Sequence, residues 1–210
     1  RGEFSGPGTA MLDGLRLWGR LGAAAGLALA LVAPSEARSA TRMVHENGWA
    51  VTAPKGWDPY QGEAAMGADF RMFGPRDRFA SCAFDSRTNL GLDMTNAQIK
   101  ATIGAVSLGS EVLSRFLLSS DLTPGELSDA VFSEPTPQPD HASGWPVQRA
   151  EFTYYDGGTK AAGGTASKGW AIITFKNDTV FVGYCGVDTE TASSVAADVN
   201  TIFNSIELTR

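Results

Sequence analysis

The chain has 210 residues, with 23 acidic and 17 basic side chains and a net charge of −6. This balance, together with the lack of any cluster of Lys and Arg, disfavours nucleic acid and anionic membrane surfaces as partners. Charged residues make up only 19% of the chain, below the usual share of about a quarter. The composition therefore indicates an exported bacterial protein rather than a cytosolic enzyme.

The first 37 residues are expected to be absent from the mature protein. Residues 1–10 show no apolar periodicity and look like a vector-derived leader, whereas residues 11–37 have the pattern of a secretory signal peptide. Two arginines precede the apolar run Leu21–Ala33, and the small residues Ser35 and Ala37 fit a cleavage site after Ala37. The run is shorter than the about 20 residues that cross a bilayer. We therefore expect an exported, soluble chain, residues 38–210, with one domain and no transmembrane segment.

Three strands and two helices are predicted in the first half of the mature chain. The strands lie between turn signals and are Gly48–Pro54, Ala68–Phe73 and Arg78–Phe84. The segment Thr95–Gln98 fits a capping box, and the helix that it opens places Ile99 and Ile103 on one face. A second helix is expected to begin near Ser110 and to end before Pro124.

The second half is predicted to contain strands joined by irregular loops. After a short strand at Ala130–Phe132, three prolines remove backbone donors and predict an extended surface loop, called here the proline loop, residues 135–146. Further strands are expected at Val147–Tyr155, Gly169–Phe175 and Thr179–Cys185. The glycine-rich segment Asp156–Ser167 is predicted to be a flexible loop, and Asn177-Asp178 to form a tight hairpin turn.

The last two strands and a closing helix complete the predicted core. Because Gly169–Phe175 and Thr179–Cys185 are apolar on both faces, they are expected at the centre of a covered sheet. Asp188 or Thr189 is expected to cap the closing helix. Its apolar stripe consists of Val195, Val199, Ile202, Phe203 and Ile206. The whole order predicts an α+β fold in which helices cover an antiparallel sheet.

The two cysteines, Cys82 and Cys185, both lie in the exported part. An even count in an oxidising compartment favours a disulfide between them. The alternative is two separate buried thiols. A metal site is not expected, because each cysteine is isolated and the two histidines, His45 and His141, lie in segments rich in polar and turn residues. We predict one disulfide, no metal and no cofactor.

Two phrases near the ends of the domain resemble a known group of folds. The opening segment Gly48–Trp57 ends in a Pro-x-Gly-Trp turn, and the closing segment Val199–Ile206 ends a helix in an apolar-Asn-Ser phrase. With the order of elements, they resemble the Mog1/PsbP/DcrB group over most of Met43–Leu208. The resemblance implies a PsbP-like α+β sandwich. It also implies largely non-enzymatic work, as assembly factors, chaperone-like adaptors or subunits that bind other proteins, and it carries over no catalytic residue.

No residue pattern indicates catalysis. A histidine-activated nucleophile would have to use one of two histidines that we expect to be solvated loop residues, and no Gly-x-Ser-x-Gly motif accompanies them. Glu151 with Asp156, or Asp69 with Asp77, are conceivable acid pairs, although surface carboxylates explain them as well. We therefore assign no catalytic residues. The alternative functions are a small secreted hydrolase that uses carboxylates, or a carrier of a small apolar ligand.

Aromatic residues beside the two loops are the candidate binding residues. Alternation along Val147–Tyr155 places Tyr154 and Tyr155 on opposite faces, so at least one aromatic side chain is expected at the surface beside the glycine-rich loop. The alternative is that all the aromatic side chains fill the core. The predicted function is the binding of a protein partner, as an accessory or assembly factor, through both loops. The candidate residues are Trp145, Tyr154, Tyr155, Gly157, Gly158 and Lys160.

Overall fold

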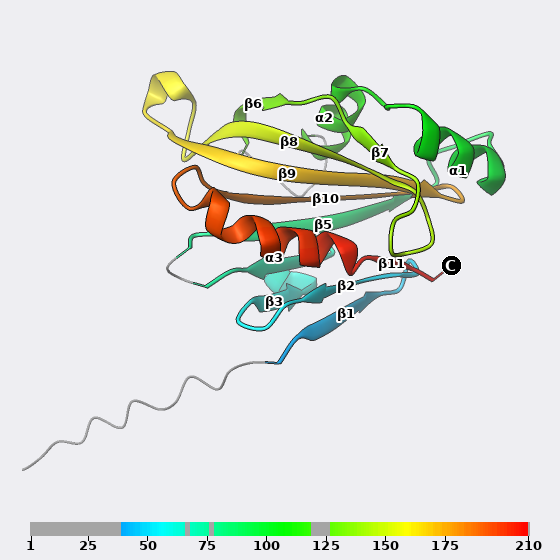
Figure 1. Ribbon diagram of the computed structural model, residues 1–210, viewed down its shortest axis with the longest axis horizontal. Helices are drawn as coiled ribbons and strands as arrows, with labels where there is room; N and C mark the ends of the chain where they lie inside the picture. Colours follow the sequence, from blue (N-terminus) through cyan, green and yellow to red (C-terminus); the bar gives the residue numbers. More distant parts are fainter. Residues whose placement is uncertain (1–38, 66–67, 76–77, 119–126, 210) are drawn as a thin grey trace, which may run out of the picture. The chain divides into compact units, whose positions relative to one another are not determined.

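The described residues form two antiparallel β-sheets, three α-helices and two short 3-10 helices (Figure 1). The computed structural model describes residues 39–209, except residues 66–67, 76–77 and 119–126. The expected leader (1–10) and signal peptide (11–37) therefore lie outside the described residues. The expected end of the second helix, before Pro124, lies outside them too.

The larger sheet has eight strands in the order β3-β4-β5-β10-β9-β8-β6, with the short β7 paired to β8. They are β3 (Asp58–Gln61), β4 (Phe70–Phe73), β5 (Ser81–Thr88), β6 (Ser128–Phe132), β7 (Thr136–Gln138), β8 (Val147–Asp156), β9 (Thr165–Lys176) and β10 (Thr179–Asp188). The predicted hairpin is confirmed, because Lys176 pairs with Thr179 across Asn177-Asp178. Its strands β9 and β10 occupy the centre of the sheet, as their apolar faces predict.

Both faces of the larger sheet are covered. One hydrophobic cluster joins the sheet to α3 and to a small three-stranded sheet of order β1-β2-β11, and a second cluster joins the opposite face to α1 and α2. The covering elements are α1 (Asn96–Ala105), α2 (Ser110–Leu118), α3 (Ala192–Asn204), β1 (Thr41–His45), β2 (Trp49–Ala53) and β11 (Glu207–Leu208). The 3-10 helices are η1 (Gly62–Ala65) and η2 (Lys160–Ala162). The predicted α+β fold, an antiparallel sheet covered by helices, is confirmed.

Two glycines of the central strands leave room for aromatic rings. A Cβ atom on Gly183 would lie 2.3 Å from the ring of Phe84, the residue opposite it on β5. A Cβ atom on Gly169 would lie 2.2 Å from the ring of Phe152, the residue opposite it on β8. Because each ring lies over the strand at the glycine, the sheet buries two large side chains that an alanine would displace.

The predicted disulfide is confirmed. Cys82 on β5 and Cys185 on β10 are directly paired across the sheet, with Cα atoms 4.0 Å apart and a sequence separation of 103. Both side chains are buried in the cluster beneath α3. The covalent link therefore joins two neighbouring central strands that the chain reaches only after a long excursion.

The N-termini of α1 and α3 show which of the two predicted helix caps are correct. The capping box is confirmed, because Thr95 accepts the backbone N–H of Gln98 while the Gln98 side chain accepts the backbone N–H of Thr95. The predicted cap of α3 at Asp188 or Thr189 is wrong. Strand β10 continues to Asp188, so the helix begins later, with Thr191 at its N-cap and no side-chain hydrogen bond there.

Two predicted loop boundaries are wrong. The ladder between β8 and β9 continues as far as the pair Asp156 and Thr165, so the connecting segment, called here the glycine loop, is residues 157–164. The proline loop contains β7, which pairs with the start of β8. Pro137 is tolerated in β7 because this strand lies at the edge of the sheet, where one side of the ladder needs no donor.

Candidate functional site

Strand β8 separates the predicted binding residues into two groups (Figure 1). Trp145 precedes the strand, in the proline loop, whereas Gly157, Gly158 and Lys160 follow it, in the glycine loop. A strand of 10 residues spans about 33 Å. The structure therefore does not bring Trp145 near the glycine loop, and the two predicted loops offer separate surfaces at opposite ends of β8.

The glycine loop projects beyond β8 and β9 as a hydrogen-bonded turn (Figure 1). Thr159 caps η2 by accepting the backbone N–H of Ala162, and Gly163 ends η2 in the left-handed conformation. The backbone N–H of Lys160 donates to Asp129 Oδ2 at 3.1 Å. Gly157 also adopts a positive φ of 74°, a conformation that glycine takes without strain. The glycines thus serve a defined turn, whereas composition alone indicated a flexible segment.

Tyr154 and Tyr155 lie on opposite faces, as alternation predicts. Tyr154 is 8% exposed, and its hydroxyl occupies the space that a Cβ atom on Gly186 would take. It lines a hollow of about 200 Å³ at the glycine-loop end of the sheet, whose other lining residues are Arg71, Phe73, Ser81, Leu127, Asp156 and Tyr184. Tyr155 is half-buried. Tyr154 therefore shapes a surface hollow instead of projecting from it.

Trp145 anchors the proline loop and lies close to two lysines. Its indole N–H donates to the backbone oxygen of Phe175 at 2.7 Å, and its ring remains half-buried. The ammonium of Lys100, from α1, lies 5.6 Å from the ring centroid, and the ammonium of Lys176, from β9, lies 5.4 Å from it. Burial lowers the pKa of Lys176. The fold thus assembles a basic and aromatic cluster at this end of β8.

His141, expected to be solvated, is only 6% exposed. Its Nε2 lies 3.0 Å from the backbone oxygen of Phe203 near the end of α3, and the backbone N–H of Ser143 donates to its Nδ1 at 3.2 Å. These partners require the neutral ring to carry its proton on Nε2. Burial lowers the pKa of His141, with a smaller contribution from Arg149. The histidine therefore ties the proline loop to α3, a role that no local sequence pattern announces.

His45 also has partners, but they do not form a nucleophile pair. Its Nε2 lies 3.2 Å from Asp69 Oδ1, and its Nδ1 accepts the backbone N–H of Asn47. The hydroxyl of Ser86 donates to Asp69 Oδ2 at 2.5 Å. The carboxylate thus lies between the serine and the histidine, whereas activation of a serine needs the base beside it. The cluster connects the β1–β2 turn to β4 and β5.

The acid pair Glu151 and Asp156, considered from the sequence, does not fit glycoside chemistry. Glu151 and Asp156 lie five positions apart on β8, about 17 Å in a strand, beyond the roughly 6.5–9.5 Å of an inverting pair. Glu151 is also paired with Lys168 at 2.8 Å. Asp69 belongs to the His45 cluster, and Asp77 lies outside the described residues.

Neither a metal-binding cluster nor a single membrane-spanning helix is found among the described residues. These residues contain no group of three or more His, Cys, Asp or Glu side chains placed to hold a metal ion. In the same part of the chain, no single helix has the length and hydropathy to cross a membrane. Helices α1 and α2 reach that length and hydropathy only when taken together, and the chain bends by 116° between them.

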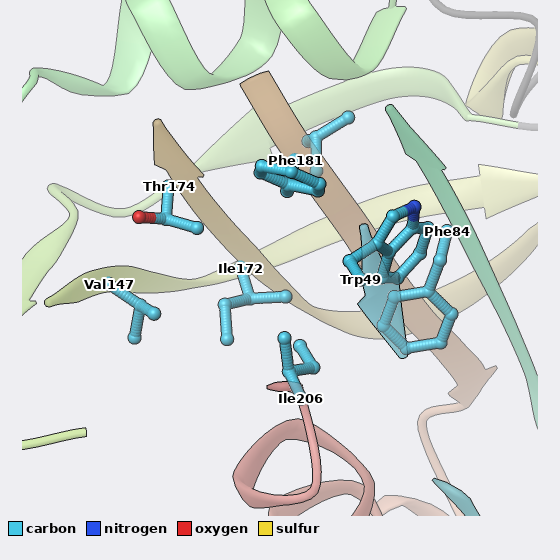
Figure 2. Close-up of a pocket in the computed structure, with 8 residues that line it drawn as sticks. Trp49, Phe84, Val147, Ile172, Thr174, Phe181 and Ile206 are labelled. Atoms are coloured by element: carbon cyan, nitrogen blue, oxygen red, sulfur yellow. The ribbon is translucent and has the colours of Figure 1, made fainter. Parts of the chain in front are cut away.

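An internal cavity lies among the side chains of the core (Figure 2). It measures about 10 Å³ and is lined by Trp49, Phe84, Val147, Ile172, Thr174, Phe181, Val182 and Ile206. This volume is at the lower limit for a single water molecule. A second, open hollow of about 140 Å³ lies beside α1, lined by Leu92, Met94, Ile99, Thr102, Ile103, Leu108 and Phe175. An enclosed cavity of similar size and lining holds one benzene.

Comparison with known proteins places this arrangement among similar folds. No protein-family model matches the chain, and no curated protein matches its sequence. Cyanobacterial PsbP (CyanoP) from Synechocystis sp. PCC 6803 is similar in structure, with 15% identity, a TM-score of 0.48 and coverage of 90% of this chain and 99% of that chain. LpqN of Mycobacterium tuberculosis, involved in cell envelope biogenesis, has 12% identity, a TM-score of 0.48 and coverage of 81% and 91%. The expected PsbP-like resemblance is confirmed, and it concerns the fold alone.

Proposed function

We propose that the chain is an exported bacterial accessory protein, periplasmic or secreted, that binds a protein partner and catalyses no reaction. The buried disulfide supports export, since such bonds persist in oxidising compartments. The predicted signal peptide at residues 11–37 supports it independently. Residues 38–210 would then be the mature protein, a single α+β domain.

The glycine loop carries this proposal. Its residues are exposed over most of their length, yet the hydrogen bonds that Thr159 and Asp129 accept from backbone N–H groups hold the turn in one conformation. A loop that is ordered before binding loses less conformational entropy when a partner docks. Exposed loops on a rigid sheet are also where proteins commonly place their binding residues. We therefore assign Gly157, Gly158 and Lys160 to the partner-binding surface, with Tyr154 and Tyr155 beside it.

Shortening the glycine loop tests the proposal. Because Asp156 pairs directly with Thr165, residues 157–164 can be replaced by Asn-Gly, which suits a two-residue hairpin. Tagged chains of both forms would be used to capture proteins from envelope extract, followed by mass spectrometry. We expect a stoichiometric partner with the unaltered loop and its loss with the short turn. Equal capture by both forms would refute the loop assignment, provided that their unfolding midpoints agree.

The proposed export is tested separately. The full chain would be produced in a bacterium, and the mass of its product would be measured in the periplasmic and cytoplasmic fractions. We expect a product that starts at Arg38 in the periplasm or medium and contains no free thiol. An uncleaved product confined to the cytoplasm would contradict the assignment of residues 11–37.

A further inference from the structure

We propose that Trp145, Lys100 and Lys176 form a recognition site for an acidic, carboxylate-bearing segment of the partner. This inference rests on the proposed function, because it names the chemistry of the protein that is bound. The three residues come from the proline loop, α1 and β9. They are called here the tryptophan clamp.

The geometry of the tryptophan clamp leaves hydrogen-bond donors available. Lys100 donates to the backbone oxygen of Gly144 at 3.1 Å, and Lys176 donates to that of Leu208 at 3.0 Å. An ammonium has three donors, so two remain on each lysine. The two nitrogens lie 5.6 and 5.4 Å from the same ring centroid, and thus no more than about 11 Å apart.

The positive charges of the clamp, on Lys100 and Lys176, are not neutralised by an ion pair among the described residues, a property that they share with Lys55 and Lys160. Other cations do have carboxylate partners, namely Arg42, Arg78, Arg87, Arg115 and Lys168. With a net charge of −6, most of the protein repels an acidic chain, so attraction at the clamp would fix where such a chain binds.

An extended acidic segment fits these distances. Side chains two residues apart in an extended chain point the same way and lie about 7 Å apart, so two of its carboxylates can each meet one ammonium of the clamp. Trp145 is half-buried and offers the segment an apolar contact beside the charges, and tryptophan is enriched at the centres of interfaces. Lys176 is half-buried, and a partly desolvated ammonium gains more from a carboxylate than a fully hydrated one does.

Binding of a hexaglutamate peptide to the full disulfide-bonded protein tests the inference. Fluorescence anisotropy of the labelled peptide would be measured at low salt and again near physiological ionic strength, with hexaglutamine as the uncharged comparison. We expect hexaglutamate to bind, hexaglutamine not to bind, and added salt to weaken the complex. No binding of hexaglutamate at low salt would overturn the proposal.

Paired variants decide whether the clamp is responsible. Lys100→Gln with Lys176→Gln should weaken hexaglutamate binding at least about tenfold. Lys55→Gln with Lys168→Gln removes the same number of positive charges away from the clamp and should change hexaglutamate binding less than about twofold. Lys100→Gln alone, at an exposed helix position, should give an intermediate loss even if the change at Lys176 disturbs folding. Equal losses in the two pairs would mean non-specific attraction and would refute the clamp.

Three further outcomes distinguish this inference from membrane binding and from the proposed function. Binding to vesicles rich in anionic lipid that is as tight as hexaglutamate binding, and that needs the same lysines, would replace the acidic segment with a membrane surface. Capture of a partner that is unaffected by the lysine variants would refute the clamp and leave the proposed function standing. Hexaglutamate binding at the clamp without any captured protein would support the site and contradict the proposed function.

Discussion

Removing the disulfide tests how far the sheet depends on one covalent link. The disulfide closes a loop and so lowers the conformational entropy of the unfolded chain. In the variant Cys82→Ala/Cys185→Ala, the unfolded chain regains that entropy. For the separation of 103 residues, the chain-entropy model gives a loss of about 4.7 kcal/mol in the free energy of unfolding. Since domains are stable by about 5–15 kcal/mol, the loss would be a large fraction of the total.

Urea unfolding followed by tryptophan fluorescence measures this loss. With a slope of about 2 kcal/mol per molar urea, the midpoint should fall by about 2 M. Reductant provides the control, because it should lower the midpoint of the natural chain toward that of the variant and leave the variant unchanged. A loss below about 1.4 kcal/mol, a factor of ten in the equilibrium constant, would refute the reasoning that the link constrains the unfolded chain.

The same unfolding assay checks three smaller effects. Gly183→Ala should lower stability by about 1–3 kcal/mol, because its Cβ atom meets the Phe84 ring. Gly104→Ala is the control, because its new Cβ atom makes only ordinary contacts, and it should be neutral or stabilising by up to about 1 kcal/mol. Equal losses of stability in the Gly183 and Gly104 variants would contradict the packing argument. Thr95→Ala should lose about 1 kcal/mol through the capping box, and an unchanged midpoint would show that the cap contributes nothing. Burial holds the pKa of His141 below its ordinary value of 6.5. The unfolded chain therefore takes up the proton first as the pH falls. The free energy of unfolding should decrease below about pH 6.5, by at most about 1.4 kcal/mol per pH unit. The difference in the free energy of unfolding between the natural chain and His141→Gln should therefore narrow on acidification. A constant difference would contradict the lowered pKa of His141.

Features set by neighbouring residues could be predicted from the sequence. The Asn177-Asp178 turn and the Thr95 capping box depend on residues within a few positions, and both are found in the structure. The disulfide could be predicted because only two cysteines exist. The central position of β9 and β10 followed from apolar residues on both faces, which only a strand covered on both sides tolerates.

Features set by distant contacts were missed. Strand β7 forms because β8 presents a free edge to the proline loop, and the prolines alone argued against any ladder there. The burial of His141 depends on the backbone oxygen of Phe203, 62 residues away in the chain. Neither partner could be identified before the sheet order and the position of α3 were known.

The tryptophan clamp shows why binding chemistry is harder to predict than fold. Along the sequence, Lys100, Trp145 and Lys176 are isolated, and the charge pattern indicates an acidic chain with no basic cluster. The structure places α1 over β9, and the indole N–H of Trp145 donates to the backbone oxygen of Phe175, which brings the ring beside Lys176. Local positive charge on a protein of net charge −6 therefore depends on packing rather than composition. For the same reason, net charge disfavours an extended anionic partner such as nucleic acid but is compatible with a short acidic segment held at one end of the sheet.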